Sequence, residues 1–63
     1  MRQYWQFDYY VDGKHKIRYF YGNEAAANSR AKKYECDSKE LIALSKSQVN
    51  YLKTVKNIRF IDL

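Results

Sequence analysis

The residues of this 63-residue chain that could do chemistry are cations and aromatic rings on either side of Asp12-Gly13. Lysines and an arginine occupy alternate positions after this dipeptide, and aromatic residues crowd the segments that flank it. Cations bind phosphate groups, and aromatic rings stack on unpaired bases with about 1–3 kcal/mol per base. Gln and Arg can also read base edges in the DNA major groove. The candidate contact residues for a nucleic acid or another partner are therefore Tyr4, Gln6, Tyr10, Lys14, Lys16, Arg18 and Phe20.

Catalytic and metal chemistry find little support in the sequence. His15 is the only histidine and Cys36 the only cysteine, so neither a nucleophile with a positioned base nor a Cys/His zinc site is expected. Gly13 and Gly22 are the only glycines, too few for a phosphate-binding glycine loop. We therefore predict a non-enzymatic protein without cofactor or metal. A single cysteine also fits a reducing compartment.

The formal net charge of +5 favours polyanions or acidic protein surfaces as partners, although solubility alone would also account for it. No apolar run approaches the roughly 20 residues that cross a bilayer, and no signal peptide is visible. We expect a soluble cytoplasmic protein with no membrane partner. The abundance of Lys, Asn, Tyr and Ser is typical of small proteins from AT-rich phages, in which case the location would be the host cytoplasm.

Two strands are predicted to position the candidate residues. Large apolar side chains alternate with polar ones over residues 3–11 and again over residues 14–21, which is the period of half-buried strands. A two-residue turn at Asp12-Gly13 would place cations beside the aromatic core. A three-residue loop with a G1 bulge instead pairs Phe7 with Ile17 and directs the cations to the outer face. We therefore predict the bulged loop, with an outer face that is both basic and aromatic.

A helix is predicted after the hairpin. Asn23 is a suitable N-cap, and Glu24 suits the positive end of a helix that extends to about Glu35. Ala27, Ala31 and Tyr34 lie on one stripe of this helix, where small side chains permit close packing on the sheet.

The remainder of the chain contains one ambiguous segment and two predicted elements. Residues 37–44 combine a possible capping box, Asp37-x-x-Glu40, with an apolar run that suits a buried strand, so both helix and strand stay open. Ser45-x-x-Gln48 is a second capping box that begins a helix reaching Val55. Residues 58–63 are predicted to form a strand that joins the hairpin, because an isolated hairpin is marginally stable. The expected fold is a single α+β domain spanning residues 1–63.

Part of the chain resembles a known family. Trp5-x-Phe7-x-Tyr9, Gly13-Lys14, and Phe20 followed by Glu24-Ala25 and a helix are similar to the AP2-like arm-type DNA-binding domain of phage and transposon integrases. The resemblance covers residues 4–34. It implies a sheet that enters the major groove, with Lys16 and Arg18 on DNA and Trp5, Phe7 and Phe20 as framework.

The sequence thus favours a small DNA- or RNA-binding module of phage or mobile-element type. The alternative is a protein inhibitor or adaptor that uses the same face on a host nucleic-acid-handling enzyme, such as a defence nuclease. A homodimer is a third possibility. A second set of cations is expected to form solvated helical surfaces: Arg30, Lys32, Lys33, Lys39, Lys46, Lys53 and Lys56.

Overall fold

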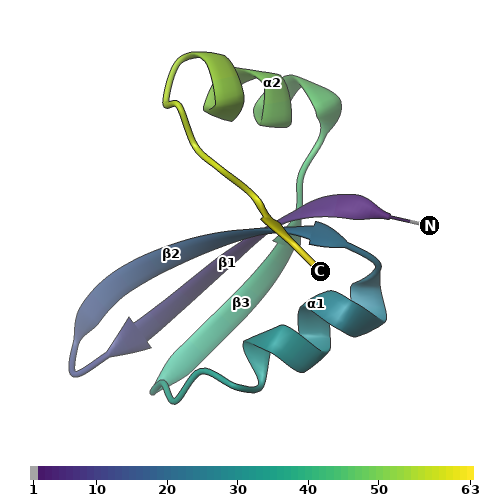
Figure 1. Ribbon diagram of the computed structural model, residues 1–63. Helices are drawn as coiled ribbons and strands as arrows, with labels where there is room; N and C mark the ends of the chain where they lie inside the picture. Colours follow the sequence, from purple (N-terminus) through teal and green to yellow (C-terminus); the bar gives the residue numbers. More distant parts are fainter. Residues whose placement is uncertain (1) are drawn as a thin grey trace.

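The computed structural model describes residues 2–63 and confirms a small α+β domain (Figure 1). Its elements are β1 (Gln3–Val11), β2 (Lys14–Gly22), α1 (Glu24–Ala31), β3 (Ser38–Ala43), α2 (Lys46–Thr54) and β4 (Ile61–Asp62). The four strands form one sheet in the order β3-β1-β2-β4. β3 runs antiparallel to β1, whereas β4 runs parallel to β2. The predicted hairpin, second helix and C-terminal strand are therefore present.

The ambiguous segment forms the edge strand β3, so the possible capping box at Asp37 starts no helix. Asp37 is held beside the hairpin tip: its N–H donates to the Tyr10 carbonyl at 2.8 Å, and its carboxylate accepts from the Asp12 N–H at 3.1 Å. Leu41 of β3 packs against the core. Pairing with β1 therefore decides the conformation of residues that were locally suited to either element. The third strand of the sheet accordingly follows α1 in the chain.

Both predicted helix starts are confirmed. The Asn23 side chain accepts from the Ala26 N–H at 2.7 Å, and Ser45 and Gln48 form the reciprocal bonds of a capping box. α1 is shorter than predicted, because the chain tightens after Ala31: the Tyr34 N–H donates to the Ala31 carbonyl three residues earlier. The C-terminal strand is also shorter than predicted, with two residues in β4.

The turn between β1 and β2 contains two residues, so the predicted bulged loop is wrong. Val11 pairs directly with Lys14, and Asp12 and Gly13 both have positive φ, 53° and 76°. Two positive φ values are those of a type I′ turn, whose twist matches that of the flanking strands. This register sets cations beside the aromatic core, which is why the sequence favours the bulged loop. They are tolerated because they remain exposed, and the Arg18 guanidinium lies 5.9 Å from the Tyr9 ring centre.

We predict that Gly13→Val destabilises the protein by about 1–2 kcal/mol, because a β-branched residue is strained at positive φ. No atom lies within 4 Å of the position that a Cβ would take on Gly13, so the cost should come from the backbone alone. Gly13→Asn is the matched control, since Asn tolerates this conformation. Urea unfolding of the three proteins measures the difference. Equal stability of the Val and Asn variants would contradict this turn.

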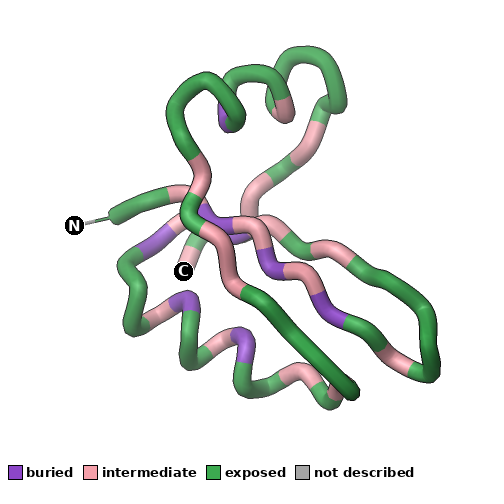
Figure 2. The backbone as a smooth tube through the Cα atoms, turned by 180° about the vertical axis from the view of Figure 1, so that it is seen from behind, coloured by how far each residue is buried: buried purple, intermediate pink, exposed green. Residues whose placement is uncertain are grey.

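The core lies on one side of the sheet, beneath α1. Its fully or nearly buried residues are Trp5, Phe7, Tyr9, Phe20, Ala27 and Ala31. Figure 2 shows the buried positions on the strands and on the surface of α1 that faces them. The Phe7 and Tyr9 rings stack at 5.0 Å, and the Trp5 indole N–H donates to the Gly22 carbonyl at 3.0 Å. The two alanines therefore serve as predicted: they let α1 approach this aromatic surface closely.

Candidate nucleic-acid interface

The two-residue turn separates the seven candidate residues between the two sides of the sheet. Directly opposed residues of antiparallel strands point to the same side, and the pairing sets Trp5 with Phe20, Phe7 with Arg18 and Tyr9 with Lys16. We call the two sides the α1 side and the α2 side, after the helix that covers each (Figure 1). Lys14, Lys16, Arg18 and Phe20 lie on the α1 side, and Tyr4, Gln6 and Tyr10 on the α2 side. The prediction that all seven share one exposed face is wrong.

The aromatic candidates differ in exposure as well as in side. Phe20 is 0% exposed and belongs to the core, so it cannot contact a partner. Tyr4 is half-buried, with its ring 4.4 Å from Tyr21 and 4.8 Å from Phe60. Tyr10 is 43% exposed and stacks on His15 at 4.9 Å. Of the predicted stacking groups, Tyr10 alone presents a largely accessible ring.

The register sorts the charged side chains of the three long strands by sign. The strand cations all lie on the α1 side: Lys14, Lys16, Arg18 and Lys39. The strand carboxylates, Asp8 and Glu40, are directly paired on the α2 side. Gln6 donates to the Asp8 carboxylate at 2.8 Å, and the His15 ring lies 3.7 Å from it. The charged residues of the three long strands are therefore sorted by sign between the two sides of the sheet.

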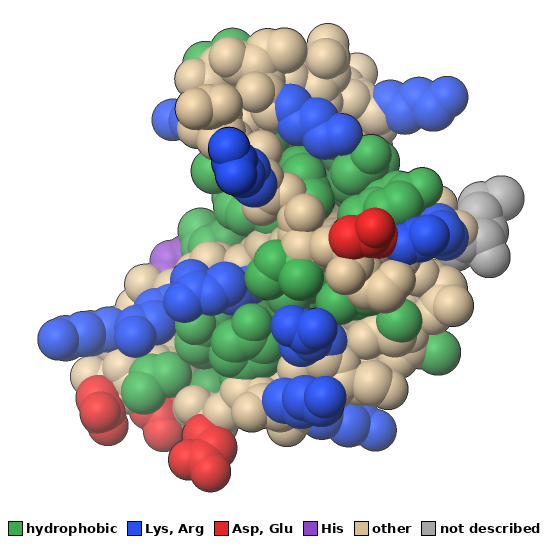
Figure 3. All heavy atoms as spheres, viewed as in Figure 1, with side chains coloured by type: hydrophobic (Ala, Val, Ile, Leu, Met, Phe, Trp, Pro, Cys, Tyr) green, Lys and Arg blue, Asp and Glu red, His purple; other side chains and the backbone are tan. Residues whose placement is uncertain are grey.

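We use the name basic row for Lys14, Lys16 and Arg18 of β2. All three are exposed, and alternate residues of a strand are about 6.8 Å apart. β4 pairs with β2 only at Phe20 and Tyr21, so within residues 2–63 no strand covers β2 alongside the basic row. Figure 3 shows Lys and Arg side chains over the hairpin and over α1, with acidic side chains gathered near the hairpin tip.

The helix on the same side extends this positive surface. Asn28 and Lys32 line a hollow of about 230 Å³ with Leu41 and Lys39, so this flank of α1 faces β3. Arg30 lies on the other side of the buried stripe of Ala27 and Ala31, which directs it toward β2. The cations of α1 therefore continue the basic row on one flank and adjoin Lys39 on the other.

A second group of cations and rings, which the sequence analysis did not combine, lies on the α2 side. Lys53 Nζ is 4.5 Å from the Tyr4 ring centre, and the Arg2 guanidinium is 4.7 Å from that of Tyr21. Phe60 meets Tyr4 from the C-terminal segment. These residues come from three parts of the chain that are far apart in sequence, so only the folded topology brings them together.

Tyr19 separates this group from the acidic part of the α2 side. Its ring meets Phe60 edge-on at 5.5 Å. Burial, and secondarily the charge of Asp8, raises the pKa of the Tyr19 hydroxyl. The hydroxyl therefore stays neutral at physiological pH, and Asp8 and Glu40 supply the charge at the centre of this side.

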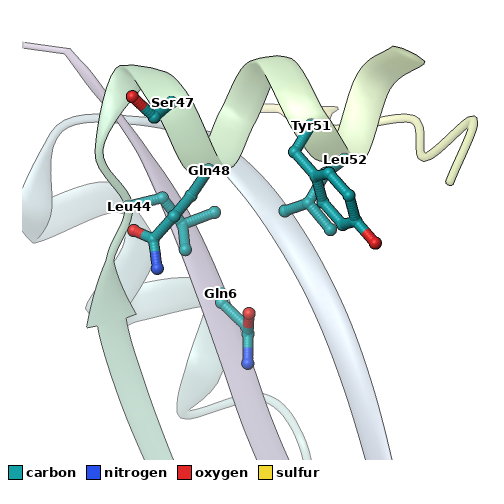
Figure 4. A pocket seen from close by; sticks show the side chains of 6 residues that line it. All are labelled: Gln6, Leu44, Ser47, Gln48, Tyr51 and Leu52. Carbon is teal, nitrogen blue, oxygen red and sulfur yellow. The ribbon is translucent and has the colours of Figure 1, made fainter. Parts of the chain in front are cut away.

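The opposite flank of α2 is uncharged. Figure 4 shows a hollow of about 330 Å³ whose lining comes from β1, the β3–α2 connection and α2: Gln6, Leu44, Ser47, Gln48, Tyr51 and Leu52. Tyr51 is 51% exposed. This flank provides amides and apolar groups, without a cation for phosphate or a base for catalysis.

Residues 2–63 contain no cluster of three or more His, Cys, Asp or Glu side chains that could hold a metal ion. Within the same residues, neither helix is long and apolar enough to cross a membrane. Comparisons with protein-family models, curated proteins and solved structures gave no match.

Proposed function

We propose that this protein is a small non-enzymatic module that binds the phosphate backbone of a nucleic acid through its α1 side. The observation that carries the proposal is the separation of charge on the sheet, which puts the strand cations on the α1 side and the strand carboxylates on the other. A polyanion approaching the α1 side meets the basic row and then Arg30, while Asp8 and Glu40 point away from it. The net charge of +5 adds long-range attraction.

The same geometry limits what kind of recognition this surface can perform. The four hairpin rings on the α1 side, Trp5, Phe7, Tyr9 and Phe20, are at most 7% exposed, so none of them is free for base stacking. The basic row therefore supplies charge contacts, which position a nucleic acid without reading its sequence. Lys14, Lys16 and Arg18 thus remain the proposed contact residues, but the surface that carries them is basic and not, as predicted, both basic and aromatic.

The test is a fluorescence-anisotropy titration of labelled duplex and single-stranded DNA at several salt concentrations. If four phosphates are neutralised, the affinity for duplex should fall on the order of 100-fold between about 50 and 200 mM salt. Lys14→Glu with Lys16→Glu should weaken binding at low salt and lower the slope of log K against log salt by about 2. Circular dichroism verifies the fold of each variant.

The matched control is Lys56→Glu with Arg59→Glu. It changes the net charge equally, at two exposed residues that lie outside the α1 side. The control should reduce affinity far less than the basic-row variant. Equal losses in the two variants would show that net charge, rather than this surface, drives binding. Absence of binding at low salt would reject the proposal.

A protein partner is the second candidate, and the uncharged flank of α2 favours it. Tyr51, which lines the hollow in Figure 4, is 51% exposed, and Val55, four residues further along the chain, is 64% exposed. Exposed tyrosine is common in protein interfaces. An inhibitor or adaptor that used this flank would keep its partner after nuclease treatment and after Lys14→Glu with Lys16→Glu, whereas nucleic-acid binding would not survive either.

A further inference from the structure

A second hollow lies on the other flank of α2, and all of its charged lining residues are cations. Its volume is about 500 Å³, within the 300–1,000 Å³ range of small-molecule sites. We call it the α2 pocket; it is lined by Arg2, Gln3, Tyr4, Tyr21, Leu44, Lys46, Val49, Asn50 and Lys53. The hollow on the opposite flank has no charged lining residue, so the charge belongs to one side of the helix only.

The helical repeat positions half of this site. Lys46, Val49, Asn50 and Lys53 have the spacing i, i+3, i+4 and i+7, which places them on one stripe of α2. Val49 is 7% exposed and anchors the stripe on the sheet. The two lysines and the amide therefore project along one wall of the pocket.

The strands supply the opposite wall. The Tyr4 and Tyr21 rings lie side by side, 4.4 Å apart and inclined at 39°. Lys53 Nζ donates to the Tyr4 hydroxyl at 3.0 Å, and Arg2 is held by the Asp62 carboxylate and by the Leu63 carbonyl at 3.0 Å. The cations are thus already oriented against aromatic surfaces before any ligand binds, which reduces the entropy lost on binding.

The start of α2 adds a further preference for an anion. The first turn of α2 contains no acidic residue and begins with Lys46, so the positive end of the helix dipole carries another positive charge. Because Arg2 is already paired with Asp62, Lys46 and Lys53 supply the available charge of the pocket, and two positive charges favour a doubly charged group such as a phosphate monoester.

From these features we propose that the α2 pocket binds a nucleoside monophosphate, either free or as the 5′-phosphorylated end of a strand. The phosphate lies between Lys46 and Lys53, beside Asn50 on the same stripe of α2. The base packs on the outer surface of the planar Arg2 guanidinium, which itself lies over the Tyr21 ring at 4.7 Å. The amides of Gln3 and Asn50 are available to hydrogen-bond the base or sugar. The inference rests on residues separate from the basic row and does not depend on the proposed function.

The experiment titrates the full chain with five ligands and measures binding by NMR amide shifts. The ligands are adenosine 5′-monophosphate, adenosine, inorganic phosphate, and a short oligonucleotide with and without a 5′-phosphate. The monophosphate should bind at least about 10-fold more tightly than adenosine or phosphate alone, and shifts should centre on Tyr21 and Lys53. If the pocket is a site for free nucleotides, the mononucleotide should bind with the same affinity as the phosphorylated oligonucleotide. A strand-end site prefers the phosphorylated oligonucleotide and still requires its 5′-phosphate.

Two variants locate the site. Lys46 is exposed on the helix, so Lys46→Ala removes its charge without disturbing the core. Lys53→Met removes the charge of Lys53 and keeps an unbranched apolar side chain over the Tyr4 ring. Each should lower the affinity for the monophosphate about 10-fold, whereas Lys56→Ala should leave it unchanged. Lys14→Glu with Lys16→Glu should also leave it unchanged, which separates this inference from the proposed function. Binding no tighter than that of inorganic phosphate, or equal binding by Lys46→Ala and Lys56→Ala, would overturn the proposal.

Discussion

Replacing Phe20 with alanine is expected to leave much of the protein unfolded at 25 °C in the absence of denaturant. The side chain is 0% exposed and lies between Phe7, at 5.9 Å, and Tyr34, at 6.3 Å. Truncating a buried phenylalanine costs about 3–5 kcal/mol, and the core of a chain this small supplies a similar amount. Urea unfolding followed by Trp5 fluorescence and circular dichroism should show the midpoint move close to zero denaturant.

Tyr10→Ala is the matched control for this prediction. Tyr10 lies in the same hairpin, but it is 43% exposed on the α2 side, so its loss should cost no more than about 1 kcal/mol. A bulged loop would have placed both rings on one outer face and made the two substitutions similarly mild. The pair therefore tests the register: equal and small effects would contradict the two-residue turn.

The elements that the sequence predicts correctly are those that local interactions decide. Asn23 and Ser45 cap their helices through side-chain bonds to backbone three residues ahead, so the signal lies within a few letters of sequence. The alternation of Trp5, Phe7 and Tyr9 likewise identified β1 and its buried side without knowledge of any partner strand. These elements follow from short-range geometry.

The hairpin register could not be derived in the same way, although its turn was recognised. The choice between two and three loop residues depended on whether cations could lie beside the aromatic core. They can, because Lys14 and Lys16 near the hairpin tip and Arg18 all remain exposed. How much of the sheet a helix covers is a property of the assembled fold. It cannot be predicted from the alternation of polar and apolar residues along one strand.

Long-range pairing also decided the features that local reasoning left open or missed. Residues 38–43 are a strand because β1 presents a free edge to them, while their own letters suited a helix equally well. The α2 pocket joins Arg2, Tyr21 and Lys53, which are far apart in sequence. A signal for it existed in the spacing of Lys46 and Lys53 on one helical stripe, but that stripe by itself is typical of a solvated surface.

Phe60→Ala should cost about 2 kcal/mol and release the C-terminal segment before the core unfolds. The ring is half-buried and packs edge-on against Tyr4 at 4.8 Å and Tyr19 at 5.5 Å, and each such aromatic pair contributes about 0.5–1.5 kcal/mol beyond burial. β4 pairs with β2 through only two residues, and the Leu63 N–H donates to the Tyr21 carbonyl at 2.9 Å. Phe60 shares the fixing of this segment with the exposed Arg2 contacts to Asp62 and Leu63 and with the packing of Leu63 against the core.

Native-state hydrogen exchange distinguishes this local release from global unfolding, because amides that open locally exchange with a smaller free energy. The Leu63 amide should lose protection in Phe60→Ala, and the Phe7 amide should change only by the loss in global stability. Val55→Ala is the control, since Val55 is 64% exposed and its truncation should cost at most about 0.5 kcal/mol. If Phe60→Ala proved as stable as Val55→Ala, with Leu63 protected equally in both, the C-terminal segment would not be held to the sheet by this ring.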